Sequence, residues 1–160
     1  MMMPEADRTP APWGAGRALV ILGGILLAAA LFLPWYVASS VGHAGVLTGI
    51  ALSAEAPELG ILPAIGLIAI LGGAVIGRAP KSMRGSTAAW GAIALGLVGI
   101  AVSVEVGFRL SSKLQSLYGP AFLDAAALGW YVAILASFLL LASGLFRLMA
   151  PHERFSPAAA

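Results

Sequence analysis

The sequence contains no cysteine. That absence excludes disulfide bonds, thiolate metal ligands, cysteine nucleophiles and thiol–disulfide redox chemistry. Charge is scarce as well, because only 10% of the 160 residues are Asp, Glu, Lys or Arg, whereas a soluble domain usually has about 25%. The formal net charge is only +2 and no basic run occurs, so nothing indicates nucleic-acid binding.

Catalytic motifs are missing too. No G-x-S-x-G, H-E-x-x-H, Walker A or dinucleotide-type glycine loop occurs. The stretch GAGRAL at 14–19 lacks both the preceding strand and the third glycine that a nucleotide loop needs. We therefore predict a protein that is not an enzyme and that binds no cofactor or metal.

Apolar residues dominate the sequence, at 60% of the chain and a mean hydropathy of +0.96. Four intervals contain no Asp, Glu, Lys or Arg: 18–54, 59–77, 85–104 and 125–146. A helix that crosses a hydrocarbon core needs about 20 mainly apolar residues. The intervals predict an all-α membrane bundle of four spans, at residues 18–38, 59–77, 86–108 and 126–146. This domain would occupy 17–148, between disordered Pro- and Ala-rich tails at 1–16 and 149–160.

The first uncharged interval is longer than one span. Pro34 and the Ser39–Ser40 pair mark the expected end of the first helix, and 39–58 is then an outer loop with an extended piece near 46–52. A signal peptide is the alternative for this region. The long apolar run and the bulky residues before the possible cleavage site favour a retained helix.

Basic residues are distributed unevenly about these spans. Seven would lie on the side of the termini and two on the other side: Arg8, Arg17, Arg78, Lys81, Arg84, Arg147 and Arg154 against Arg109 and Lys113. The positive-inside rule then places both termini in the cytoplasm. Aromatic residues fit this arrangement, because Trp35, Tyr36, Trp130 and Tyr131 would anchor the outer interface.

Small residues recur at four-residue spacing in every span. Helix association in lipid depends on such residues, because they allow backbones to approach closely. The expected packing residues are Gly73, Gly77, Gly96, Gly129 and Ala133. Packing within one chain is the first interpretation, and a homo-oligomer or docking to another membrane protein is the alternative.

No ionisable residue lies near the middle of a predicted span. Glu105 is the nearest, and Arg109 follows one turn later, so we expect an ion pair at the outer interface; a carboxylate that gates or binds an ion is the alternative. His43 and His152 fall on opposite sides and cannot share a metal, which makes His43 a solvated loop residue in the simplest interpretation.

Three stretches carry a resemblance: LFLPWY at 31–36, LGILPAIGLIAILGGAVIG at 59–77 and LGWYVAILASFLLLASG at 128–144. In layout over about residues 17–148, the chain resembles small uncharacterised four-span membrane proteins of actinobacterial type. That resemblance implies no activity, and it assigns no functional residue.

The sequence thus predicts a non-enzymatic, multi-pass protein of the bacterial cytoplasmic membrane. Its partners would be the lipid bilayer and either other membrane proteins or further copies of itself. An accessory or scaffold subunit that acts through helix packing and its outer surface is the first hypothesis. A small oligomeric transporter or channel is the alternative.

Overall fold

The computed structural model describes residues 13–40, 43–76, 86–118, 120 and 122–149. The described chain is mostly helical. Its longer elements are the helices α1 (Trp13–Ala30), α3 (Ile61–Ile76), α4 (Ser86–Tyr118) and α5 (Leu128–Met149), and the strands β1 (Pro34–Ser40) and β2 (His43–Thr48). Three short helices complete the fold: α2 (Gly49–Ser53), η1 (Pro57–Gly60) and η3 (Phe122–Asp124).

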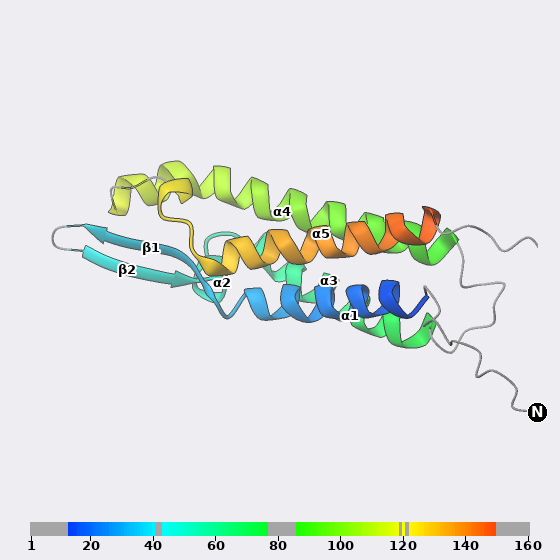
Figure 1. Ribbon diagram of the computed structural model, residues 1–160. Helices are drawn as coiled ribbons and strands as arrows, with labels where there is room; N and C mark the ends of the chain where they lie inside the picture. The colour runs from blue at the N-terminus through cyan, green and yellow to red at the C-terminus, as the bar shows by residue number, and fades with distance from the viewer. Residues whose placement is uncertain (1–12, 41–42, 77–85, 119, 121, 150–160) are drawn as a thin grey trace, which may run out of the picture.

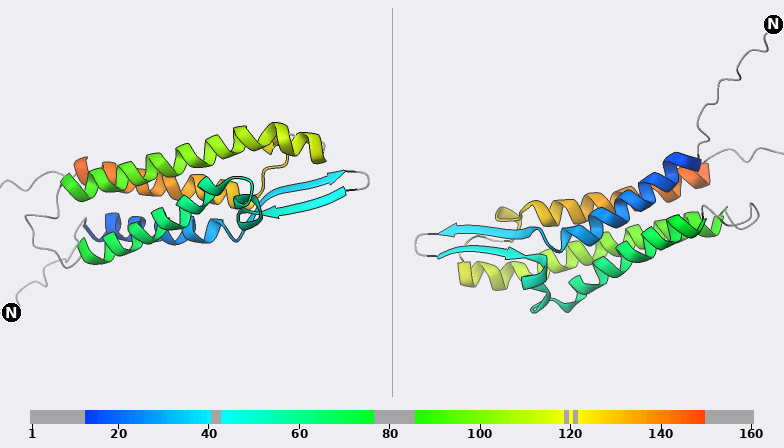
Figure 2. Two further views of the ribbon diagram at one scale, coloured as in Figure 1. Left: turned by 180° about the vertical axis from the view of Figure 1, so that it is seen from behind. Right: turned by 90° about the horizontal axis from the view of Figure 1, so that it is seen from below.

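The four long helices run side by side as one elongated bundle (Figure 1). α1 lies between α3 and α5, and α4 packs along α5, whereas α3 and α4 contact each other less extensively. The beginning of α1 and the end of α5 lie together, and the strands project from the opposite end in every view (Figures 1 and 2).

Three of these helices are long and apolar enough to cross a membrane: α3 with the preceding η1, α4 and α5. α1 is apolar but shorter, with 18 residues and a length of about 27 Å at 1.5 Å per residue. α4 has 33 residues, or about 50 Å, which exceeds the hydrocarbon core of about 30 Å. α4 therefore continues to Tyr118 instead of ending at residue 108, and its last turns stand beyond the bundle.

The first predicted span is wrong at its outer end. α1 stops at Ala30, and residues 34–40 form a strand, so the fold contains an antiparallel hairpin and is not purely helical. Pro34 has no N–H to continue a helix. The hairpin pairs Val37 with Val46, and the other edge of β1 is held by a loop distant in sequence, where the Val37 N–H donates to the Ala125 carbonyl over 2.9 Å.

Aromatic side chains fill the base of this hairpin. Trp35 and Tyr36 are both 0% exposed, so the prediction that they anchor the chain among lipid headgroups is wrong. The Trp35 indole N–H donates to the Ala30 carbonyl over 2.8 Å, and the Tyr36 hydroxyl donates to the Pro120 carbonyl over 2.9 Å. Phe122 stacks on Tyr36 with ring centroids 6.1 Å apart. These side chains therefore form a core that joins the hairpin to the bundle.

The second aromatic pair lies differently. Trp130 is half-buried and donates to the Ser103 carbonyl over 3.0 Å, so it joins α5 to α4. Tyr131 is 54% exposed on the outside of α5, where a membrane interface could receive it.

Glycines set the closest approaches between helices. A Cβ atom on Gly24 would lie 2.7 Å from the Gly66 carbonyl oxygen, and one on Gly96 would lie 2.7 Å from the Ser137 carbonyl oxygen. Among the other predicted packing residues, a Cβ on Gly73 would meet Ile21 of α1 at 2.9 Å. Gly129 and Ala133 are buried, Gly129 against Trp35, and Gly77 lies outside the described residues.

Candidate functional site

A small head stands beyond the bundle at the hairpin end. We define the head as β1, β2, α2, η1, η3 and the α4 residues from Arg109 onward. Tyr36, Leu52, Leu59 and Phe122 are buried within it, so the head has a core of its own that is continuous with the bundle. Both ion pairs of the described chain and several exposed apolar side chains belong to the head, so we take it as the candidate site.

Two ion pairs bind the end of α4 to the segment before α3. Arg109 donates from its two terminal guanidinium nitrogens to the two carboxylate oxygens of Glu58, over 2.9 and 2.6 Å. Lys113, one turn further along α4, pairs with Glu55. Bidentate geometry makes the first pair the more directional of the two. Both pairs are solvent-exposed and connect α4 to the α2–η1 segment.

The pairing of Arg109 corrects the sequence-based prediction. Glu105 was expected to be its partner, but the hydrogen bonds of Arg109 go to Glu58, and Glu105 adds only a weaker attraction at longer range. Glu58 and Arg109 lie just outside the predicted spans 59–77 and 86–108.

The sequence did contain a signal for these pairs. Arg109 and Lys113 are the only two bases on the predicted outer side, spaced four residues apart, and Glu55 and Glu58 are spaced three apart on the same side. Matched spacing of opposite charges suggests two facing elements. The expected pairing of Arg109 with Glu105 instead missed the role of these two acids.

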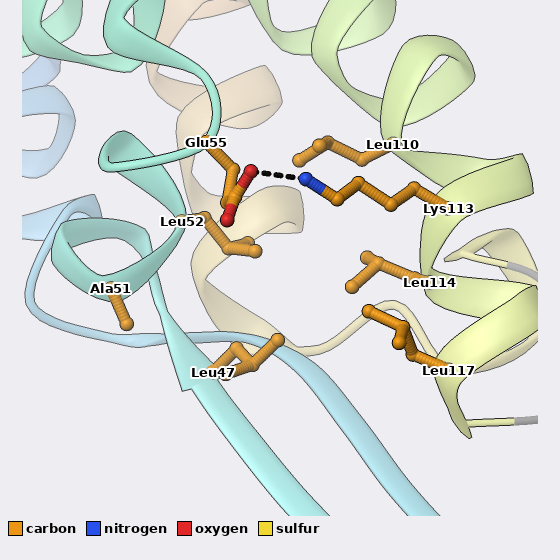
Figure 3. Close-up of a pocket in the computed structure, with 8 residues that line it drawn as sticks. All are labelled: Leu47, Ala51, Leu52, Glu55, Leu110, Lys113, Leu114 and Leu117. Atoms are coloured by element: carbon orange, nitrogen blue, oxygen red, sulfur yellow. Dashed lines mark hydrogen bonds and ion pairs between the residues drawn. The ribbon is translucent and has the colours of Figure 1, made fainter.

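A hollow of about 190 Å³ lies between the hairpin side of the head and the end of α4 (Figure 3). Its lining is mainly aliphatic, with the Glu55–Lys113 pair at one edge: Leu47, Ala51, Leu52, Glu55, Leu110, Lys113, Leu114 and Leu117. Pockets for small molecules usually have volumes of about 300–1,000 Å³. The hollow is smaller than this range, and its aliphatic lining suits an apolar side chain.

Large apolar side chains are also exposed on the head. Val46 is 63% exposed and Leu117 is 60% exposed, and Val37 lies opposite Val46 on the same outward face of the hairpin. Val37, Val46 and Leu117 therefore give the head exposed apolar positions in addition to its two ion pairs.

Buried polar side chains are few among the described residues. Ser103, Ser137 and Ser143 are 0% exposed, and each donates to a carbonyl of its own helix: Gly99, Ala133 and Leu140, respectively. The Arg147 Nε is buried at the opposite end of the bundle from the head, beside Gly16. Between these serines and Arg147, the buried residues of the bundle are apolar or small, which favours a packed bundle over a polar conduit.

Glu105 is exposed on α4, and its carboxylate has no hydrogen bond or ion pair with the side chains that the structure describes. His43 is the first residue of β2, where its backbone pairs with Ser40. Within the described ranges, no cluster of three or more His, Asp or Glu residues is placed to hold a metal ion.

Comparison with known protein families, with characterised proteins and with solved structures finds no match for this chain. The resemblance to four-span actinobacterial proteins therefore stays a prediction. Function has to be inferred from the head and the helix surfaces themselves.

Proposed function

We propose that this chain is a non-enzymatic integral membrane protein that serves as an accessory or scaffold subunit. It crosses the bacterial cytoplasmic membrane four times, with both termini in the cytoplasm and the head outside. The head and the outer faces of the helices bind other membrane proteins.

The four-span topology is supported by the position of α1. α1 runs beside α3 and α5 along the bundle, so a membrane that contains its neighbours also contains α1. Arg17 of α1 and Arg147 of α5 lie at the end away from the head. Seven of the nine basic residues fall on this side under the proposed topology, which agrees with the positive-inside rule.

The observation that carries the proposed function is the head itself. Its fold is fixed by buried aromatic residues and two ion pairs, yet it exposes Val37, Val46 and Leu117 outward. A fold of this kind holds an apolar surface in a defined shape, which lowers the entropic cost of binding a partner.

The same structure gives less support to transport. Small transporters usually carry ionisable residues that face the bundle interior. Here the fully buried polar side chains described within the bundle are three serines bonded to their own helices. Arg147 is partly buried at the end of α5 away from the head, and Glu105 is exposed on the outside of α4.

The test is purification in mild detergent, with measurement of which proteins co-purify at fixed stoichiometry. We expect a partner that is lost when Val37 and Val46 are both changed to Ser and retained in Asp124→Asn, an exposed polar change on the same head. A chain that purifies only as a homo-oligomer and supports ion flux in proteoliposomes would instead favour the transporter.

A further inference from the structure

The Arg109–Glu58 pair leaves one charge of α4 without a partner. Arg109 is the basic residue nearest to Glu105 along the helix, and both terminal nitrogens of its guanidinium bind Glu58. Glu105 projects from a helix face on which Ala101, Val104 and Phe108 are also exposed. A carboxylate therefore stands on an apolar surface, one turn further into the bundle than Arg109.

The part of the chain that the structure describes leaves this face of α4 exposed. α5 packs on the opposite face, against Gly96 and Gly99. A Cβ atom on Gly91 would meet nothing within 4 Å, and Ala94 and Ala101 are likewise exposed. Gly91, Ala94, Val98, Ala101 and Glu105 follow one another at alternating three- and four-residue spacing, so they lie along one line of the helix.

We infer that this face of α4 binds a transmembrane helix of another protein that carries a Lys or Arg near its outer end, and that this cation pairs with Glu105. The inference rests on the proposed membrane location and names the partner chemistry for an accessory subunit. Charge complementarity selects the partner, because a carboxylate on an apolar face in lipid is costly until an opposite charge reaches it.

A second copy of the chain does not fit this face. A symmetric pair of α4 helices would bring Glu105 of one copy against Glu105 of the other, and like charges at close range repel. A lipid amine is the other source of positive charge. Glu105 lies about 6 Å deeper than Arg109 at 1.5 Å per residue, below the headgroup level that Arg109 marks, so a cation carried on a helix reaches it more readily.

The experiment uses the full chain in vesicles of phosphatidylcholine and phosphatidylglycerol. Because the chain has no cysteine, Gln115→Cys on the exposed end of α4 supplies a single site for a donor fluorophore. The probe is a synthetic Leu/Ala transmembrane peptide with one Lys near its outer end and an acceptor fluorophore. A matched peptide has Leu in place of the Lys. Energy transfer as a function of peptide density gives the relative affinities.

We expect the Lys peptide to associate at least fivefold more tightly than the Leu peptide. Glu105→Gln should remove that difference, whereas the control Asp124→Asn, which removes an exposed carboxylate of the head, should retain it. Ala101→Phe should weaken association of the Lys peptide by obstructing the face. Circular dichroism verifies that each variant is folded.

Three outcomes would overturn the inference: equal association of the two peptides, a Lys preference that survives Glu105→Gln, or loss of the preference when phosphatidylethanolamine is added. The last result would assign the cation to lipid. None of these results alters the co-purification that depends on Val37 and Val46, so failure of this inference is distinguishable from failure of the proposed function.

Discussion

Gly91 and Gly96 both lie on α4, but we expect their substitution by alanine to change the stability of the protein in different ways. A Cβ atom on Gly96 would lie 2.7 Å from the Ser137 carbonyl oxygen and 2.7 Å from the Leu141 nitrogen, and both are backbone atoms of α5. A Cβ atom on Gly91 would have no neighbour within 4 Å. Backbone atoms cannot rotate away as a flexible side chain can, so Gly96→Ala must push α4 and α5 apart.

Overpacking of this kind costs about 1–3 kcal/mol of unfolding free energy. Gly91→Ala adds no contact and replaces a poor helix former with a good one, so it should be neutral or stabilising by up to about 1 kcal/mol. We expect Gly96→Ala to lower the thermal midpoint in detergent by several degrees, while Gly91→Ala leaves it unchanged or raises it.

The assay is circular dichroism at 222 nm during heating in dodecyl maltoside, with all proteins at the same detergent concentration. A double variant tests whether backbone atoms cause the loss of stability. Gly96→Ala combined with Leu141→Ala should not regain stability, because the atoms nearest to the added Cβ are backbone atoms. Equal midpoints for Gly96→Ala and wild type would refute the reasoning, as would a loss of stability confined to Gly91→Ala.

Two further predictions concern topology and burial. Single cysteines at Ser40 and Ser82 should react oppositely with an impermeant thiol reagent on whole cells, with Ser40→Cys labelled; labelling of Ser82→Cys alone would reverse the proposed orientation. Brominated lipids should quench Trp90, which is 60% exposed, much more than Trp35, which is 0% exposed; this is measured in variants that retain one tryptophan each, and equal quenching would contradict the burial of Trp35.

The helices were predictable where composition alone defines them. Uncharged intervals bounded by Glu58 and Arg78, and by Asp124 and Arg147, locate α3 and α5 to within a few residues. The beginning of α4 at Ser86 was also predicted, since Arg84 and Gly85 precede it. Hydrophobicity and charge are local properties of the sequence, so no knowledge of the tertiary structure was needed.

The end of α1 was not predictable in the same way. Residues 18–38 are uniformly apolar, and their composition does not separate a helix that ends at Ala30 from one that ends at Ala38. The end of α1 depends on the pairing of β1 with other segments, because β1 bonds to β2 on one edge and to the loop around Ala126 on the other. Pro34 was the one local signal that the helix had to end before the strand.

The position of Trp35 and Tyr36 shows a second limit of the same kind. An aromatic pair between an apolar run and a polar loop is typical of a membrane interface. In the structure, η3 places Phe122 against Tyr36, and a Cβ on Gly129 would lie 2.7 Å from the Trp35 indole nitrogen, so both rings are enclosed. A sequence pattern identifies an aromatic side chain with an apolar body and a polar group. Whether its apolar body faces lipid or protein depends on the neighbours that pack against it in the folded chain.

Glu58 and Glu105 compete for one guanidinium, and the outcome links the head to the bundle surface. Glu105 lies one turn from Arg109 on the same helix, a spacing at which the two side chains can pair. Glu58 on η1 instead places both of its carboxylate oxygens against both terminal nitrogens of Arg109, which is the stronger bidentate arrangement. The bidentate pair therefore connects η1 to α4 and leaves the carboxylate of Glu105 on the outer face. Loss of Glu58 would release Arg109 to turn back toward Glu105 and neutralise it. A head held in place and a charged helix face are thus two consequences of the same pairing, and a partner that displaced Glu58 from Arg109 would alter both.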